Sequence, residues 1–238
     1  MRLLLTRAEP EAQASAERLR QLGHGLLIAP MLDITALPPP AEIPDPAAIA
    51  FTSANAVRAI ATWPKARAWK AAQIFAVGDA TADAARAAGF TKVVSAKGGS
   101  AELAALIATT LSADAGPVLC PAAETPAGDL AGALRAAGLV VHQVTAYRAT
   151  PATELPTPTR DAIVNRAIDA ILFYSERGAA AFVDLVTGDD LAGSLAGVRL
   201  LALSVQVAGP LRVLAAARLN VADQPTEASL FALLAAND

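Results

Sequence analysis

The stretch FAVGDATADAA, Phe75–Ala85, contains the pattern that decides the fold. Its apolar start predicts a buried strand that stops at Gly78, and its alanine-rich end predicts a helix. Asp79 and Thr81 follow the glycine. A strand that turns through glycine and small polar residues into a helix leaves free N–H groups at the helix N-terminus, where proteins bind anions. The stretch therefore predicts an α/β unit with an anion site at its turn.

Short apolar runs alternate with helical patterns along the rest of the chain. Leu3–Arg7 predicts a buried strand, Glu11–Gly23 predicts a helix that stops at Gly23, and Leu26–Leu32 predicts a second strand. Alternation of this kind predicts parallel sheets that are covered by helices on both faces. Two Pro-rich stretches, Leu37–Pro46 and Thr150–Arg160, suit neither strand nor helix and are predicted to be linkers.

The order of the elements also repeats. IAFTSANA, Ile49–Ala56, matches ILFYSERG, Ile171–Gly178, and FAVGDATADAA matches LALSVQVAGPL, Leu201–Leu211. We therefore expect two similar α/β lobes joined by the Pro-rich stretches. Ligands of open parallel sheets bind outside the carboxyl ends of the strands, so the turns that follow these strands are expected to line a cleft.

Composition narrows the class of protein. The 238 residues suit one large domain or two small ones, and the net charge is −3 with no stripe of Lys and Arg, which argues against a nucleic-acid partner. No apolar run is long enough to span a membrane, and the N-terminal run is too short for a signal peptide. We expect a cytoplasmic protein without a membrane partner. Cys120, the one cysteine, is predicted to be a buried residue without a disulfide.

Several catalytic signatures are missing from the sequence. It contains no G-x-G-x-x-G, no phosphate-binding P-loop and no G-x-S-x-G motif. His24 and His142 lack the spacing of metal ligands. An enzyme with this sequence is therefore expected to use backbone amides, hydroxyls and arginines, with no metal and no cofactor.

Five motifs occur in order: LLTRAEPEAQASAERLRQLGH, FTSANAV, FAVGDATADAARAAGF, VTAYRA and FYSERGAAAF. Together they resemble the uroporphyrinogen-III synthase family over nearly the whole chain. The resemblance implies two flavodoxin-like lobes, each a parallel sheet flanked by helices, joined by a two-stranded linker. Residues 1–36 and 152–238 would form lobe 1 and residues 37–151 lobe 2, with linker strands near 33–37 and 148–153.

The resemblance also implies a reaction. The family cyclises hydroxymethylbilane, a linear tetrapyrrole with eight carboxylates, to uroporphyrinogen III, with loss of water and inversion of ring D. It implies no cofactor and no metal. The implied partners are hydroxymethylbilane itself and, by transient contact, the preceding enzyme, hydroxymethylbilane synthase.

Site residues follow from the matched motifs. Tyr147 matches the tyrosine of the family and is expected either to donate a proton to the leaving hydroxyl or only to pack. The turns and two arginines are expected to bind the carboxylates of the substrate. The polar turn residues could equally be helix caps, and the arginines could be surface residues. The predicted substrate-binding residues are Arg7, Thr52, Ser53, Asn55, Gly78, Asp79, Thr81, Arg148, Ser175 and Ser204.

Departures from the family pattern concentrate in the C-terminal part. Leu203–Val207, LSVQV, stands where the family often has a Gly-Pro-Thr type of turn, and Tyr174 stands where Thr is usual. These departures keep a second interpretation open, a non-catalytic two-lobe module that binds a small anionic or tetrapyrrole ligand. A weaker third is a flavodoxin-like or receiver protein, although Leu3–Glu9 lacks the paired acidic residues of a receiver.

Overall fold

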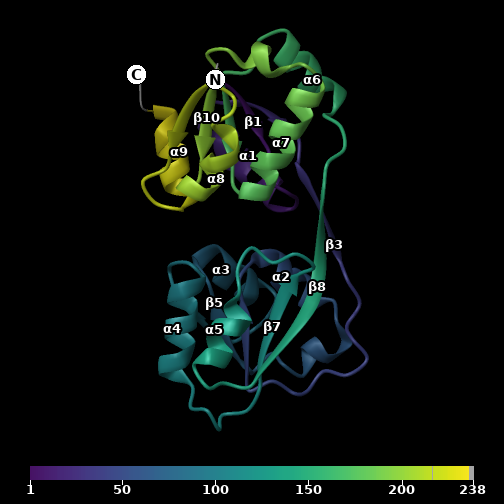
Figure 1. Ribbon diagram of the computed structural model, residues 1–238, viewed down its shortest axis with the longest axis vertical. Helices are drawn as coiled ribbons and strands as arrows, with labels where there is room; N and C mark the ends of the chain where they lie inside the picture. Colours follow the sequence, from purple (N-terminus) through teal and green to yellow (C-terminus); the bar gives the residue numbers. More distant parts are fainter. Residues whose placement is uncertain (216, 236–238) are drawn as a thin grey trace. The chain divides into compact units, whose positions relative to one another are not determined.

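The computed structural model describes residues 1–215 and 217–235. They form two compact units, each with its own sheet and its own hydrophobic core (Figure 1). Unit 1 consists of Met1–Asp33 and Thr150–Asp238, and unit 2 is Ile34–Ala149. The sheets are built mainly of parallel strands with helices on both faces, which confirms the predicted α/β class.

Two strands carry the chain between the units. The chain leaves unit 1 within β3 (Leu32–Ala36) and returns within β8 (Val141–Pro151), and the two strands are neighbours in one sheet. The Leu37 N–H donates to the carbonyl of Ala146 at 2.8 Å, just past the end of β3. Residues 37–46, predicted to be a linker, contain no helix or strand.

The sheet of unit 1 has the strand order β11-β10-β9-β1-β2, and all of its pairings are parallel. Leu4 packs on one face with α6, α7 and α8, whereas Leu3 and Leu5 pack on the other with α1 and α9. Alternate residues of a strand point to opposite faces, so covering both faces requires the unbroken apolar run Leu3–Leu5. The elements are β1 (Arg2–Leu5), α1 (Glu11–Gln21), β2 (Gly25–Ile28), α6 (Thr157–Val164), β9 (Ala170–Phe173), α7 (Glu176–Gly188), η2 (Ala192–Leu195), β10 (Arg199–Ala202), α8 (Val205–Leu211), β11 (Arg218–Val221) and α9 (Glu227–Ala235).

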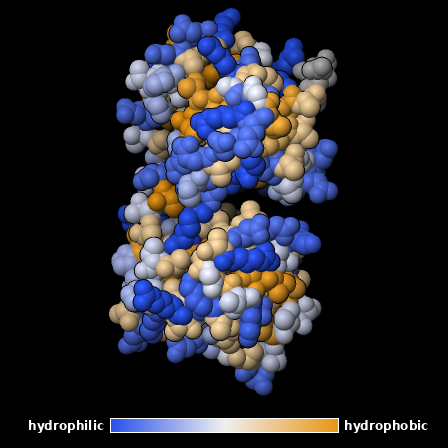
Figure 2. Space-filling model, turned by 180° about the vertical axis from the view of Figure 1, so that it is seen from behind, coloured by the Kyte–Doolittle hydropathy of each residue, from blue (hydrophilic) through white to orange (hydrophobic). Residues whose placement is uncertain are grey.

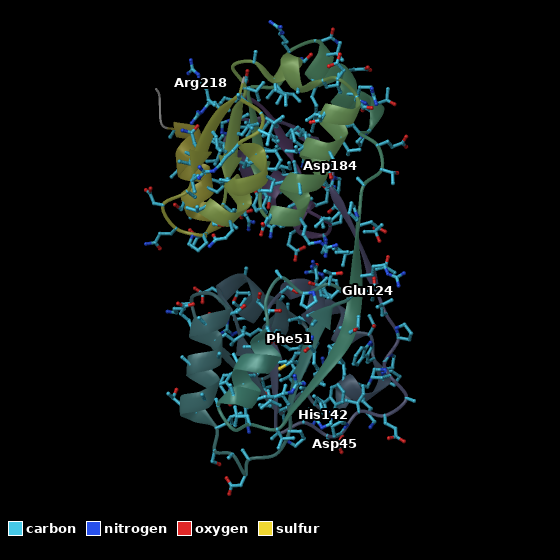
Figure 3. The ribbon with its side chains drawn as sticks, in the orientation of Figure 1. Asp45, Phe51, Glu124, His142, Asp184 and Arg218 are labelled. Carbon is cyan, nitrogen blue, oxygen red and sulfur yellow. The ribbon has the colours of Figure 1, made fainter. Side chains whose placement is uncertain are left out.

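The sheet of unit 2 has the order β3-β8-β7-β4-β5-β6. Ile49 and Phe51 pack with α2 and α3, whereas Ala48 and Ala50 pack with α4 and α5 on the opposite face. Phe51 lies in the interior of the unit (Figure 3). The elements are β4 (Ala48–Phe51), α2 (Ala54–Ala61), η1 (Pro64–Arg67), β5 (Gln73–Ala76), α3 (Asp79–Ala87), β6 (Lys92–Ser95), α4 (Ser100–Thr110), β7 (Val118–Ala123) and α5 (Leu130–Ala136).

Two local predictions are wrong, and proline explains both. The strand predicted over Leu26–Leu32 ends at Ile28, before Pro30, which has no N–H for a sheet hydrogen bond. The stretch Thr150–Arg160 is not a linker throughout, because α6 begins at Thr157. Pro158 occupies its first turn, where a helix needs no N–H donor.

Hydrophilic residues are spread over both units on the face shown in Figure 2. On the face shown in Figure 2, strongly apolar colouring is confined to separate patches. Across residues 1–215 and 217–235, no helix has the length and apolarity that crossing a membrane requires.

Candidate active site

Predicted site residues gather at the carboxyl edge of the sheet in unit 2. Strands β4, β5 and β7 are parallel, so the turns that follow them meet at one edge. Ser53 follows β4 and is the N-cap of α2, where its Oγ accepts a hydrogen bond from the Ala56 N–H at 3.1 Å. Thr52 beside it is exposed. The helix-cap interpretation of Ser53 is therefore confirmed, and the hydroxyl still has bonding capacity to spare.

Tyr147 reaches the same edge from β8. Its hydroxyl lies 3.1 Å from Ser53 Oγ, and only 9% of the residue is exposed. The pairing of β8 with β7 shifts register here: Ala122 pairs with Thr145, but Ala123 pairs with Tyr147. A shift of this kind leaves one residue unpaired and redirects the side chains beyond it. It accounts for Ala146 and Tyr147 both packing in the core that α2 covers.

Arg148, next to Tyr147, binds an acidic residue of its own unit. Its Nε and one of its terminal nitrogens each donate to Glu124 at 2.8 Å, with both side chains about half exposed. The hydrogen bond from Arg148 lowers the pKa of the Glu124 carboxyl below its ordinary value. Glu124 lies beside β8 (Figure 3), and its own N–H donates to the Tyr147 carbonyl at 2.9 Å. The pair thus fastens the end of β7 to the strand that bears Tyr147.

The turn after β5 is open to ligands. Gly78 is the N-cap of α3, and no side chain caps this helix. A Cβ added at Gly78 would meet no atom within 4 Å, so the space beside the first turn is empty. Asp79 is exposed, whereas Thr81 is buried. The uncapped N–H groups of α3 are therefore able to donate hydrogen bonds to a carboxylate, as the N–H groups of a helix N-terminus do in general.

Asn55 has a partner that the sequence did not reveal. The guanidinium of Arg58 donates to Asn55 Oδ1, one turn along α2. The spacing of three residues on a helix is the signal that could have indicated this pair. Arg58 thereby brings a positive charge to the same helix that Ser53 caps.

Arg7, predicted to bind substrate, also binds an internal carboxylate in unit 1. It donates to Glu227 at 3.1 Å and to Ser15 at 3.1 Å, and its guanidinium lies 4.4 Å from the ring centre of Tyr174. Arg18 donates to the other oxygen of Glu227. Burial, with the Glu227 carboxylate nearby, raises the pKa of Tyr174. Glu227 was missed because it is 220 residues away from Arg7 along the chain.

The remaining predicted residues of unit 1 are helix caps. Ser175 accepts from the Gly178 N–H at 3.1 Å at the start of α7, and Ser204 accepts from the Val207 N–H at 3.4 Å at the start of α8. Like Ser53, each follows a parallel strand. Ser204 has this geometry within the stretch LSVQV, Leu203–Val207.

The side chains that commonly act as nucleophiles or metal ligands, cysteine and histidine, do not lie beside Ser53 and Tyr147. Cys120 is buried in β7, and burial raises the pKa of its thiol to about 12. His142 is at the opposite end of β8 from Glu124 (Figure 3). Within the described residues, no three His, Cys, Asp or Glu side chains gather as a metal site would need. What the edge of unit 2 offers is a pair of hydroxyls, free helix N–H groups and nearby arginines.

A cavity of about 430 Å³ lies away from these residues. It is in unit 1, between β2 and α6, and its lining includes Arg2, Gly25 and Asp161. None of the predicted site residues lines it. Arg2 and Gly25 begin their strands, so this cavity is at the amino edge of the sheet, whereas ligands of such sheets bind at the carboxyl edge.

Comparisons with known proteins agree with the architecture. A family model described as uroporphyrinogen-III synthase HemD matches residues 13–232. The structure resembles that of uroporphyrinogen-III synthetase from Helicobacter pylori, with 17% identity, 99% of each chain covered and a TM-score of 0.65. It also resembles a mutant uroporphyrinogen III synthase from Thermus thermophilus, with 20% identity, 99% of this chain and 96% of that chain covered, and a TM-score of 0.56. No curated protein sequence matches the chain.

Proposed function

The chain belongs to the uroporphyrinogen-III synthase family, and from this membership we propose that it cyclises hydroxymethylbilane as a cofactor-independent lyase, with Tyr147 as proton donor. As a member of this family, the protein is an enzyme of tetrapyrrole synthesis that forms uroporphyrinogen III. The observation that carries the donor role is the Tyr147 hydroxyl at the carboxyl edge of unit 2, 3.1 Å from Ser53.

The first chemical step is loss of the substrate hydroxyl. Tyr147 gives its proton to this group as the carbon–oxygen bond breaks, and water leaves. The first ring becomes a reactive azafulvene that keeps its N–H proton and carries a positive charge. The phenolic O–H of Tyr147 is the donor in this step.

Ring inversion then depends on how the substrate is held. The substituted carbon of ring D attacks the azafulvene to form a spiro intermediate, and fragmentation with re-closure inverts the ring. Because the bilane also cyclises unaided to the uninverted type I isomer, the enzyme must fold the substrate so that inversion is faster. Catalysis by positioning is the main contribution, with proton donation added to it.

The substrate carboxylates are proposed to bind at strand-to-helix turns. Gly78 and the uncapped first turn of α3 offer the most open N–H groups, with Asp79 and Thr81 in that turn. Thr52 and Ser53 precede α2 in the same unit, and Asn55 lies in the first turn of this helix. Ser175 and Ser204 are the corresponding caps in unit 1.

Two arginines are also proposed to bind substrate carboxylates, although each already binds a carboxylate of the protein. Arg7 and Arg148 already bind Glu227 and Glu124, so either arginine must share its guanidinium with an internal carboxylate when it binds a substrate carboxylate. Arg148 in particular has half of its side chain exposed, which leaves room for a second partner. The proposal further includes a cytoplasmic location and transient contact with hydroxymethylbilane synthase, which supplies the unstable substrate.

Substitution of Tyr147 tests the donor role. We expect Tyr147→Phe to lower the rate of type III formation about a hundredfold, within the range of a lost general acid, and to leave the fold intact. Tyr174→Phe is the matched control, because it removes the hydroxyl of the other tyrosine in the chain. We expect its rate to stay within about twofold of the wild type, because Tyr174 is not the proposed proton donor and its hydroxyl takes no part in the proton transfer. An unchanged rate in Tyr147→Phe would remove the donor role.

A further inference from the structure

The hydroxyl of Ser53 connects the N-terminus of α2 to the proposed proton donor. Its Oγ accepts from the Ala56 N–H at 3.1 Å and lies 3.1 Å from the Tyr147 hydroxyl. A serine hydroxyl has one proton and two lone pairs. The Ala56 N–H occupies one lone pair, so the Ser53 hydroxyl keeps its proton and one lone pair for Tyr147, and either hydroxyl can donate across this contact.

We infer that Ser53 is a positioning residue for Tyr147: it orients the phenol before proton transfer and donates a hydrogen bond to the phenolate afterwards. The inference rests on the proposed donor role of Tyr147. It gives Ser53 a task that differs from direct binding of a substrate carboxylate.

The proposed proton transfer begins and ends at the Tyr147 oxygen. When Ser53 donates to the Tyr147 oxygen, the phenol proton is left to point at the leaving hydroxyl. On transfer, the phenol O–H bond and the carbon–oxygen bond of the substrate break, and the proton joins the departing hydroxyl to form water. Negative charge stays on the Tyr147 oxygen, and the matching positive charge is on the first ring. The proton that the tetrapyrrole releases on ring closure returns to this oxygen.

Burial makes the Ser53 donor necessary. Since only 9% of Tyr147 is exposed, bulk water contributes little to stabilising a phenolate there. A hydrogen bond to an ionised oxygen is about twice as strong as one between neutral groups. The Ser53–Tyr147 bond therefore strengthens as the proton leaves, and the Ala56 N–H at the positive end of α2 polarises it in the favourable direction.

The main chain around Tyr147 is held independently of Ser53. The Glu124 N–H donates to the Tyr147 carbonyl, and the Arg148–Glu124 pair fastens the neighbouring residue. Removal of the Ser53 hydroxyl should therefore release the phenol without displacing β8. This separation makes the inference testable by single substitutions.

The test is the kinetics of Ser53→Ala with type III formation as the readout. We expect kcat to fall about tenfold, which corresponds to about 1.4 kcal/mol in the barrier, whereas KM changes less than about twofold because the lost bond acts only during proton transfer. Ser53→Thr keeps the hydroxyl and should restore most of kcat. In a Tyr147→Phe background, Ser53→Ala should cause no further loss, because its effect acts through the phenol.

Loss of the helix cap is controlled by Asp129→Ala. Asp129 caps α5 in the same unit, where it accepts from the Gly132 N–H at 2.8 Å, and it has no part in the proposed chemistry. Both alanine variants should lower the urea midpoint, but only Ser53→Ala should lower kcat.

Two results overturn the inference. One is a Ser53→Ala variant with raised KM and unchanged kcat, as expected of a residue that binds substrate. The other is an effect that adds in full to that of Tyr147→Phe. Wild-type protein that forms only the type I isomer would instead overturn the proposed function, so the two failures are distinguishable.

Discussion

Tyr147 and Ser53 are 94 residues apart in the chain, yet their hydroxyls are 3.1 Å apart. Sequence motifs indicated both residues separately, the tyrosine through VTAYRA and the serine through FTSANAV. Their contact was not predicted, because it depends on the register shift in β8 that brings Tyr147 opposite Ala123. A shift of one residue has no signature in the sequence of β8, whose 11 residues mix small, polar and aromatic side chains without a strict alternation.

The two arginines show the same limit at the residue scale. Arg7 and Arg148 were predicted as partners for substrate carboxylates, and that role stays a prediction. Each binds an internal carboxylate, Glu227 or Glu124, that spacing could not reveal, because the partner comes from another element of the fold. Charge alone indicated that these arginines would find carboxylates, without indicating which.

Cys120 gives a prediction that depends on burial of one side chain. Its thiol pKa of about 12 implies that at pH 8 the reactive thiolate is about three orders of magnitude scarcer than in a free cysteine of pKa about 8.5. We expect native protein to resist iodoacetamide at pH 8 and urea-unfolded protein to react fully, as measured by mass spectrometry. Equal labelling of both states would show that the strand opens readily.

At the scale of elements, local sequence predicted the strand–turn–helix units well. Apolar runs became buried strands, and the small polar residues that follow them became N-caps, as at Ser53, Ser175 and Ser204. Gly23, the predicted stop of the first helix, follows α1 with a φ of +83°. The errors at Pro30 and Pro158 arose because proline ends a strand but is tolerated in the first turn of a helix.

The turn at Gly78 leads to a prediction about substrate binding. Its φ of −153° is available to any residue, and an added Cβ meets no atom within 4 Å. We expect Gly78→Ala to change the free energy of unfolding by less than about 0.5 kcal/mol. The methyl group should obstruct the approach of a carboxylate to the N–H groups of α3 and raise KM for hydroxymethylbilane.

Gly138 provides the matched control for this substitution. An added Cβ there also meets no atom, but its φ is +85°, which strains any residue with a side chain. Gly138→Ala should therefore lower the free energy of unfolding by about 1 kcal/mol and leave KM unchanged. Urea unfolding and steady-state kinetics measure both quantities. If Gly78→Ala left KM unchanged, carboxylate binding at α3 would be contradicted.

At the scale of the whole molecule, the two units draw on different parts of the chain. Local patterns predicted two similar α/β lobes. Because the repeats follow one another along the chain, they alone would have assigned the first half of the chain to one lobe and the second half to the other. The discontinuous arrangement came from the family resemblance instead. Pairing of β1 with β9, from residues such as Leu4 and Ile171, joins distant segments, and no local pattern indicates which parallel strands become neighbours.

The central claim concerns which isomer the protein makes. Purified protein should be supplied with hydroxymethylbilane generated in situ by hydroxymethylbilane synthase, and the products should be oxidised and separated by chromatography, with a reaction lacking the protein as reference. The account predicts the type III isomer as the main product, formed faster than the unaided reaction. Type I alone, at the uncatalysed rate, would contradict it.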